Sequence, residues 1–80
     1  MLYDNFNSSA VKSVEILDNT VKIVYNSNIN KEYTFSCEDV EEFQQSFSKL
    51  LIDVELNLSN ASVGHFIHHQ IKSNVLVESK

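Results

Sequence analysis

Hydrophobic and polar residues alternate along the first half of the chain with the two-residue period of β-strands. In residues 11–17, Val14 and Ile16 alternate with polar side chains, which predicts a strand with one buried face. The pair Asp18-Asn19 follows directly. Because Asp and Asn tolerate positive φ angles better than other non-glycine residues, this pair predicts a two-residue turn and a tight antiparallel hairpin.

Two further strands with the same period follow the turn, in residues 20–26 and 31–37. The residues that share one face are hydrophobic or aromatic in both: Val21, Ile23 and Tyr25 in the first, and Tyr33, Phe35 and Cys37 in the second. Residues 26–30 between them are mostly polar, with asparagine in positions where glycine is common in loops. The pattern therefore predicts a three-stranded antiparallel β-meander.

The hydrophobic spacing changes to three and four residues after the third strand, as in an amphipathic helix. The apolar stripe consists of Val40, Phe43, Phe47, Leu50 and Leu51. Residues 36–39 supply hydroxyl and carboxylate groups that suit a helix start. Residues 52–58 alternate as a strand would, yet Val54 and Leu58 also continue the helical stripe, so periodicity alone does not decide. We expect helix into the middle fifties and a loop after it.

A second helix is predicted from Ser62, a favourable N-cap residue. Its inner face is formed by Val63, Phe66, Ile67, Gln70 and Ile71, and its opposite stripe by His65, His68, His69 and Lys72. Gly64, the only glycine of the chain, lies just inside the helix start. Residues 75–77 are too short to classify, and the last residues are expected to fray.

Together these elements predict an α+β fold, in which a three-stranded antiparallel β-meander is followed by two helices packed on one face of the sheet. The 80 residues form a single domain, with a core of about residues 8–72 and a frayed tail over residues 73–80. A chain of this length leaves little room for an enclosed active-site cleft, so a large multi-substrate enzyme is not expected.

Charge and cysteine content narrow the functional classes further. The formal net charge is −5 with six lysine and arginine residues, which argues against generic electrostatic binding of nucleic acid. A single cysteine, Cys37, cannot form an internal disulfide. No apolar run approaches the length of a signal core or a membrane span. A cytoplasmic protein without membrane contact is expected.

Three segments of the chain resemble the motifs of one known family. Residues 8–14 read SSAVKSV, residues 33–35 read YTF, and residues 62–72 read SVGHFIHHQIK. They resemble the opening motif, the central Tyr-x-Tyr and the closing Gly-containing motif of the KTSC domain. This family is named for the C-terminus of some lysyl-tRNA synthetases and includes free-standing small proteins. The chain departs from the closing motif at His65, Ile67 and His68, where the family has a basic residue, an aromatic residue and asparagine.

The resemblance implies a small single domain for which RNA binding has been suggested. In physical terms, the helix start at Ser62 and Gly64 would hold a phosphate, while His65 and Lys72 add charge. The alternative is that Ser62 simply caps the helix and Gly64 packs, which needs no ligand. The residues favour a non-enzymatic binding domain that contacts a macromolecular partner, either an unknown protein or nucleic acid, through Ser62, Gly64, His65, His68, His69 and Lys72.

Metal binding is a further alternative for the histidine stripe. His65 and His69 are four residues apart, so both side chains lie on one helix face and could chelate zinc, nickel or copper. A stable site normally needs a third or fourth ligand, and the sequence identifies none. We therefore expect a polar surface and no cofactor.

Other reactive groups have simpler structural explanations. Cys37 shares a strand face with Tyr33 and Phe35, as a small core thiol would. Those two aromatics could stack nucleobases, yet the helices need that face for packing. The acidic run Glu38, Asp39, Glu41 and Glu42 suits the solvated start of a helix. No enzymatic activity is expected, and pairing of sheet edges between two copies is a further expectation.

Overall fold

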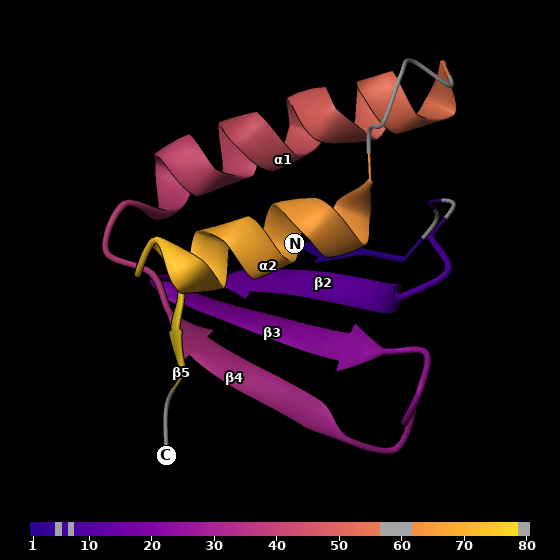
Figure 1. The fold of residues 1–80 in the computed structure, drawn as a ribbon. Coiled ribbons are helices and arrows are strands. Elements are labelled where there is room, and N and C mark those ends of the chain that lie inside the picture. The colour runs from indigo at the N-terminus through magenta and orange to yellow at the C-terminus, as the bar shows by residue number, and fades with distance from the viewer. Residues whose placement is uncertain (5, 7, 57–61, 79–80) are drawn as a thin grey trace.

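Figure 1 shows a sheet whose strands lie beneath two neighbouring helices. This computed structural model describes residues 1–4, 6, 8–56 and 62–78. Within these residues the strands are β1 (Leu2–Tyr3), β2 (Val11–Leu17), β3 (Thr20–Tyr25), β4 (Glu32–Ser36) and β5 (Val77–Glu78), and the helices are α1 (Val40–Glu55) and α2 (Val63–Lys72). The sheet has the order β1-β2-β3-β4-β5, and each neighbouring pair is antiparallel. The α+β class is confirmed.

The meander expected from the alternating pattern forms the centre of this sheet. Asp18 adopts a φ of 53°, and Leu17 pairs with Thr20 across the turn, as the Asp-Asn pair predicts. A register shift between Val11 and Ser13 marks a β-bulge in β2. Because the extra residue of a bulge changes which face the next side chain takes, Val11 and Val14 are both buried although they are three residues apart.

The strand count differs from the expected three, since a short strand has been added to each edge of the meander. In β1, Tyr3 pairs with Val14, and in β5, Val77 pairs with Ser36. Two-residue strands are too short to show a period of two, so the sequence pattern could not reveal them. The expected frayed tail differs as well, because Leu76 is buried in the core and precedes β5. Residues 79–80 lie outside the described residues.

Both helices begin where the sequence predicts. The Asp39 carboxylate accepts a hydrogen bond from the backbone N–H of Glu42 at 3.3 Å, and the Ser62 hydroxyl accepts one from the N–H of His65 at 3.3 Å. These side chains satisfy amide groups that have no partner within the first helical turn. Helix α1 ends in the middle fifties, with Leu56 as its C-cap. The loop expected after it falls on residues 57–61, outside the described residues.

Helix α2 ends in a Schellman motif built around Asn74. The N–H of Asn74 donates to the carbonyl of Ile71 at 3.1 Å, and the N–H of Val75 donates to the carbonyl of Gln70 at 2.9 Å. Asn74 has a φ of 62°, in the left-handed region that this motif requires at the first residue beyond the cap. The motif turns the chain sharply, so that Leu76 enters the core and β5 reaches β4.

An aromatic cluster joins the helices to the sheet. Phe47 is fully buried and meets Tyr3 edge-on at 5.1 Å between ring centroids. Phe66 of α2 lies 5.7 Å from Phe43 and 5.9 Å from Phe47. The rest of the core comes from the strands β2–β4, from the inner face of α2 and from two residues next to strands, namely Val11, Val14, Ile16, Val21, Ile23, Phe35, Val63, Ile67, Cys37 and Leu76. The contact of Phe47 with Tyr3 places α1 towards the β1 edge of the sheet.

Candidate functional site

The exposed side of α2 carries four polar side chains that can bind a partner. We call these residues the outer stripe: His65, His68, His69 and Lys72, all exposed. The helix turns them outwards because Val63 and Ile67 on the opposite face are buried, each with 1% of its surface accessible. Lys72 carries a positive charge, and imidazole rings can both donate and accept hydrogen bonds. The stripe can therefore bind acidic or polar groups of another molecule.

The start of α2 is explained by packing. A Cβ atom on Gly64 would lie 3.0 Å from the Cβ of Ala10, closer than ordinary van der Waals contact. Gly64 has no positive φ, so its lack of a side chain serves this close approach to the beginning of β2. The hydroxyl of Ser62 is already engaged by the N–H of His65. Ser62 and Gly64 thus both have structural roles at the helix start.

The two helices differ in charge. Helix α1 contains Glu41, Glu42, Asp53 and Glu55 against a single lysine, whereas α2 contains no acidic residue over its whole length. Within the described residues, the ion pair present is that between Lys22 and Glu32, at 3.8 Å on the sheet. The outer stripe therefore carries the positive charge of Lys72 and no acidic residue, on a protein whose formal net charge is −5.

The histidine pair considered for metal binding lies on one exposed face. His65 and His69 both belong to the outer stripe, and the Nε2 of His69 is 3.5 Å from the hydroxyl oxygen of Ser73. Over residues 1–4, 6, 8–56 and 62–78, no group of three or more His, Cys, Asp or Glu side chains is placed to hold a metal ion. A two-histidine arrangement without further ligands does not make a stable zinc site.

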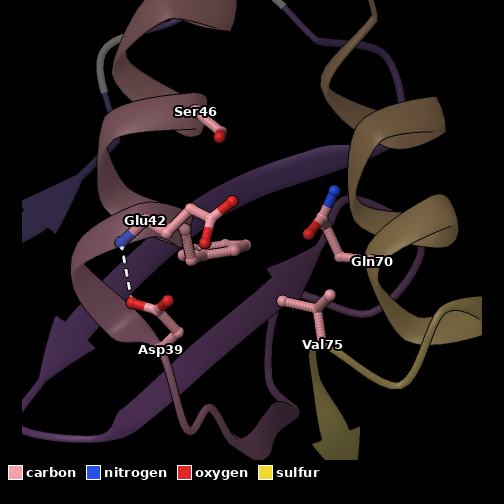
Figure 2. Close-up of a pocket in the computed structure, with 6 residues that line it drawn as sticks. Asp39, Glu42, Ser46, Gln70 and Val75 are labelled. Atoms are coloured by element: carbon pink, nitrogen blue, oxygen red, sulfur yellow. Dashed lines mark hydrogen bonds between the residues drawn. The ribbon is translucent and has the colours of Figure 1, made fainter.

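A cavity of about 210 Å³ lies between the start of α1 and the end of α2 (Figure 2). Its lining residues are Asp39, Glu42, Phe43, Ser46, Gln70 and Val75. The carboxylate of Asp39 is engaged as the helix cap, and acidic side chains at a helix start are favoured by the helix dipole. Figure 2 shows the polar side chains of Glu42, Ser46 and Gln70 around the opening. These groups supply hydroxyl, amide and carboxylate chemistry, but the described lining has no histidine or cysteine to act with Ser46.

The single thiol lies in the core, as its strand face predicts. Cys37 has 1% of its surface accessible, and burial raises its pKa. The thiolate is the reactive form of cysteine, so this environment lowers its reactivity. Cys37 is a packing residue.

A second exposed feature lies on the helix-facing side of β3 and β4. Tyr25 and Tyr33 meet with ring centroids 5.3 Å apart and ring planes at 77°, and we call them the tyrosine pair. Because Ile23 pairs with Tyr33, Tyr25 is the diagonal neighbour of Tyr33 on the same face. Both rings are half-buried, whereas Phe35 is buried. The sequence pattern predicts that Tyr33 packs in the core together with Phe35, and it does not show that Tyr33 is only half-buried.

The tyrosine pair has charged neighbours. The ammonium group of Lys31 lies 4.7 Å from the centroid of the Tyr33 ring, within the range of a cation–π interaction. Burial, the neighbouring Tyr33 hydroxyl and the Glu78 carboxylate, in that order, raise the pKa of Tyr25. A cation therefore lies over the Tyr33 ring, and the charge of a carboxylate on β5 acts on Tyr25.

Over the described residues the sheet ends in two short strands, each of which covers only part of the strand beside it. The edge strands β1 and β5 each have two residues. The expected pairing of two copies through these strands would therefore start from few backbone hydrogen bonds. Among the helices of the described residues, none is both long enough and apolar enough to cross a bilayer.

Comparison with models of protein families, with curated proteins and with solved structures finds no match to this chain. The fold defines the class, a small α+β domain with a five-stranded antiparallel sheet over the described residues. Its function has to be inferred from the surfaces described above.

Proposed function

We propose that this chain is a small non-enzymatic interaction domain that contacts a macromolecular partner through the outer stripe of α2. The observation that supports this proposal is an exposed face of α2 that contains no acidic residue. Four side chains project from this face: His65, His68, His69 and Lys72. Such a concentration of donors gives a partner several hydrogen bonds and a positive charge at once. One helix face is smaller than a standard stable interface, so the contact is expected to be transient.

The proposal can be tested by affinity capture with matched variants. Wild-type protein is compared with two variants that change exposed positions only. The stripe variant combines His65→Ala, His68→Ala, His69→Ala and Lys72→Ala, and the α1 control combines Glu41→Ala, Gln45→Ala, Lys49→Ala and Ile52→Ala. We expect the same partner to be retained by wild type and by the α1 control, and lost with the stripe variant. Equal retention by all three proteins, or no retained partner, would contradict the proposal.

Weak RNA binding through the start of α2 is the second candidate. It is supported by the first turn of α2, which holds no acidic residue, whereas the first turn of α1 holds Glu41 and Glu42. The free amides of a helix start favour phosphate. Fluorescence polarisation with short labelled RNA at low salt should then show binding that weakens as salt rises. Binding that is absent or insensitive to salt counts against RNA.

From the sequence resemblance we further propose that the chain is a KTSC-like domain of a cytoplasmic protein. Three motifs over residues 8–72 support this assignment. An experimentally determined KTSC structure in which the meander and the two helices superpose on β2–β4, α1 and α2 would bear it out, and a different topology would reject it.

A further inference from the structure

The tyrosine pair forms a corner of two aromatic faces at the surface. The two ring planes are nearly perpendicular at 77°, and both residues are half-buried, so each keeps part of its surface in contact with solvent. The faces of aromatic rings carry partial negative charge and attract cations. Pairs of tyrosine rings at such angles are therefore suited to hold a positively charged group.

The charges near the tyrosine pair indicate that its ligand is a cation. The ammonium of Lys31 already lies over the Tyr33 ring, and the negative charge of Glu78 on β5 contributes, after burial and Tyr33, to raising the pKa of Tyr25. Glu78 pairs with Phe35 in the sheet, which puts it one step along the same face from Tyr33. With a formal net charge of −5, the protein as a whole attracts cations.

The contact of the Lys31 ammonium with the Tyr33 ring is local and weak. Lys31 is exposed and precedes Tyr33 by two residues, so its long side chain reaches the ring without a tertiary constraint. A flexible lysine held only by a solvent-exposed cation–π contact exchanges readily with another cation. An arginine would be a stronger ligand, because its planar guanidinium stacks on aromatic faces and can also pair with a carboxylate such as Glu78.

We propose that the tyrosine pair is a receptor for an arginine side chain of a protein partner, and that Lys31 fills this receptor in the free protein. Tyr25 and Tyr33 supply the aromatic faces, and Glu78 supplies the opposing charge. When the partner binds, its guanidinium displaces the Lys31 ammonium into solvent. This site is separate from the outer stripe, so the outcome of its test does not depend on the function proposed for the stripe.

The test is an NMR titration that follows the ring signals of Tyr25 and Tyr33. The probes are a blocked Gly-Gly-Arg-Gly-Gly peptide and the same peptide with citrulline, which has nearly the same shape but no charge. We expect the arginine peptide to shift both ring signals at millimolar concentration and the citrulline peptide to leave them unchanged. In Lys31→Ala the affinity should rise about two- to tenfold because the internal competitor is gone, whereas Lys49→Ala on α1 should behave as wild type.

Ring variants separate aromatic recognition from simple charge attraction. Tyr33→Phe keeps the ring and should keep binding, and Tyr33→Leu removes it and should abolish the shifts at Tyr25. If Tyr33→Leu does not fold, the paired peptides still decide the outcome. Equal shifts with citrulline, no shifts in either wild type or Lys31→Ala, or shifts produced by oligothymidylate but not by the arginine peptide would each overturn the proposal. The stripe variant should bind the peptide as wild type does.

Discussion

Gly64 and Ala10 are in contact where the start of α2 passes over the start of β2, and a Cβ on Gly64 would lie 3.0 Å from the Cβ of Ala10. Gly64→Ala is therefore expected to lower the free energy of unfolding by about 1 kcal/mol, because the crowding outweighs the gain in helix propensity. Urea denaturation followed by circular dichroism measures the change.

The double mutant supplies the control for this contact. In an Ala10→Gly background the crowding is absent, so Gly64→Ala should raise the free energy of unfolding by several tenths of a kcal/mol through helix propensity alone. A coupling energy near zero between the two positions would show that Ala10 is not what keeps residue 64 a glycine.

Asn74 should behave as a helix-stop residue. Its φ of 62° disfavours residues with a branched or bulky side chain, and alanine there is expected to cost about 1 kcal/mol. Asn74→Gly should be neutral or stabilising by a few tenths of a kcal/mol, since glycine adopts this conformation freely. Thermal unfolding of both variants gives the comparison, and equal destabilisation by alanine and glycine would argue for a role of the asparagine side chain instead.

Phe47 is expected to be the most sensitive core position. It has no accessible surface and contacts the rings of Tyr3, Phe6, Phe43 and Phe66. Phe47→Ala should cost about 3–5 kcal/mol, which a domain of this size tolerates poorly. Phe47→Leu should cost less and allow a measurement by urea denaturation. Ile52→Ala on the same helix, at a position 56% exposed, should stay within about 0.5 kcal/mol of wild type.

Tyr25 should make the stability of the domain fall in alkaline solution. Its pKa in the folded protein is raised above the ordinary value of 10.0, so the unfolded chain loses this proton at a lower pH than the folded one. The stabilising contribution is therefore complete below pH 10 and is lost as the pH rises through the folded-state pKa. Titration of tyrosinate absorbance should show one late component that Tyr25→Phe removes. A titration unchanged by Tyr25→Phe would contradict this assignment.

Cys37 should be protected from thiol reagents in the native state. Its burial and raised pKa both disfavour the thiolate. Modification by a disulfide reagent at pH 8 should be slow in the folded protein and become fast in denaturant. Rapid stoichiometric labelling without denaturant would mean that the end of β4 opens readily.

The central elements could be predicted from sequence because each carries a long, regular pattern. The seven residues of β2 match the predicted range, and Ser62 and Asp39 cap their helices as their chemistry predicts. Strands β1 and β5 could not be predicted, since pairing of two residues depends on tertiary contacts. A sequence signal for β5 was present in Asn74, because this residue ends α2 and turns the chain so that Leu76 enters the core.

Helical periodicity is sufficient to predict the outer stripe, because a helix with one strongly buried face turns its opposite face to solvent. Periodicity could not reveal why residue 64 is glycine, since Ala10 is distant in sequence and the contact is made in three dimensions. The prediction that Tyr33 belongs to the core missed its partial exposure for a related reason. Alternation shows which side of a strand a residue occupies, but not where along that side the covering helix ends.

The two-residue strands at the rims have a consequence for handling the protein. They cover part of β2 and part of β4, whose free backbone groups would otherwise recruit strands from other molecules. Any tag placed close to β1 or β5, or any cleavage between Asn74 and Val77, would disturb that cover. Aggregation during expression is then the expected symptom, and a flexible spacer before the tag is the expected remedy.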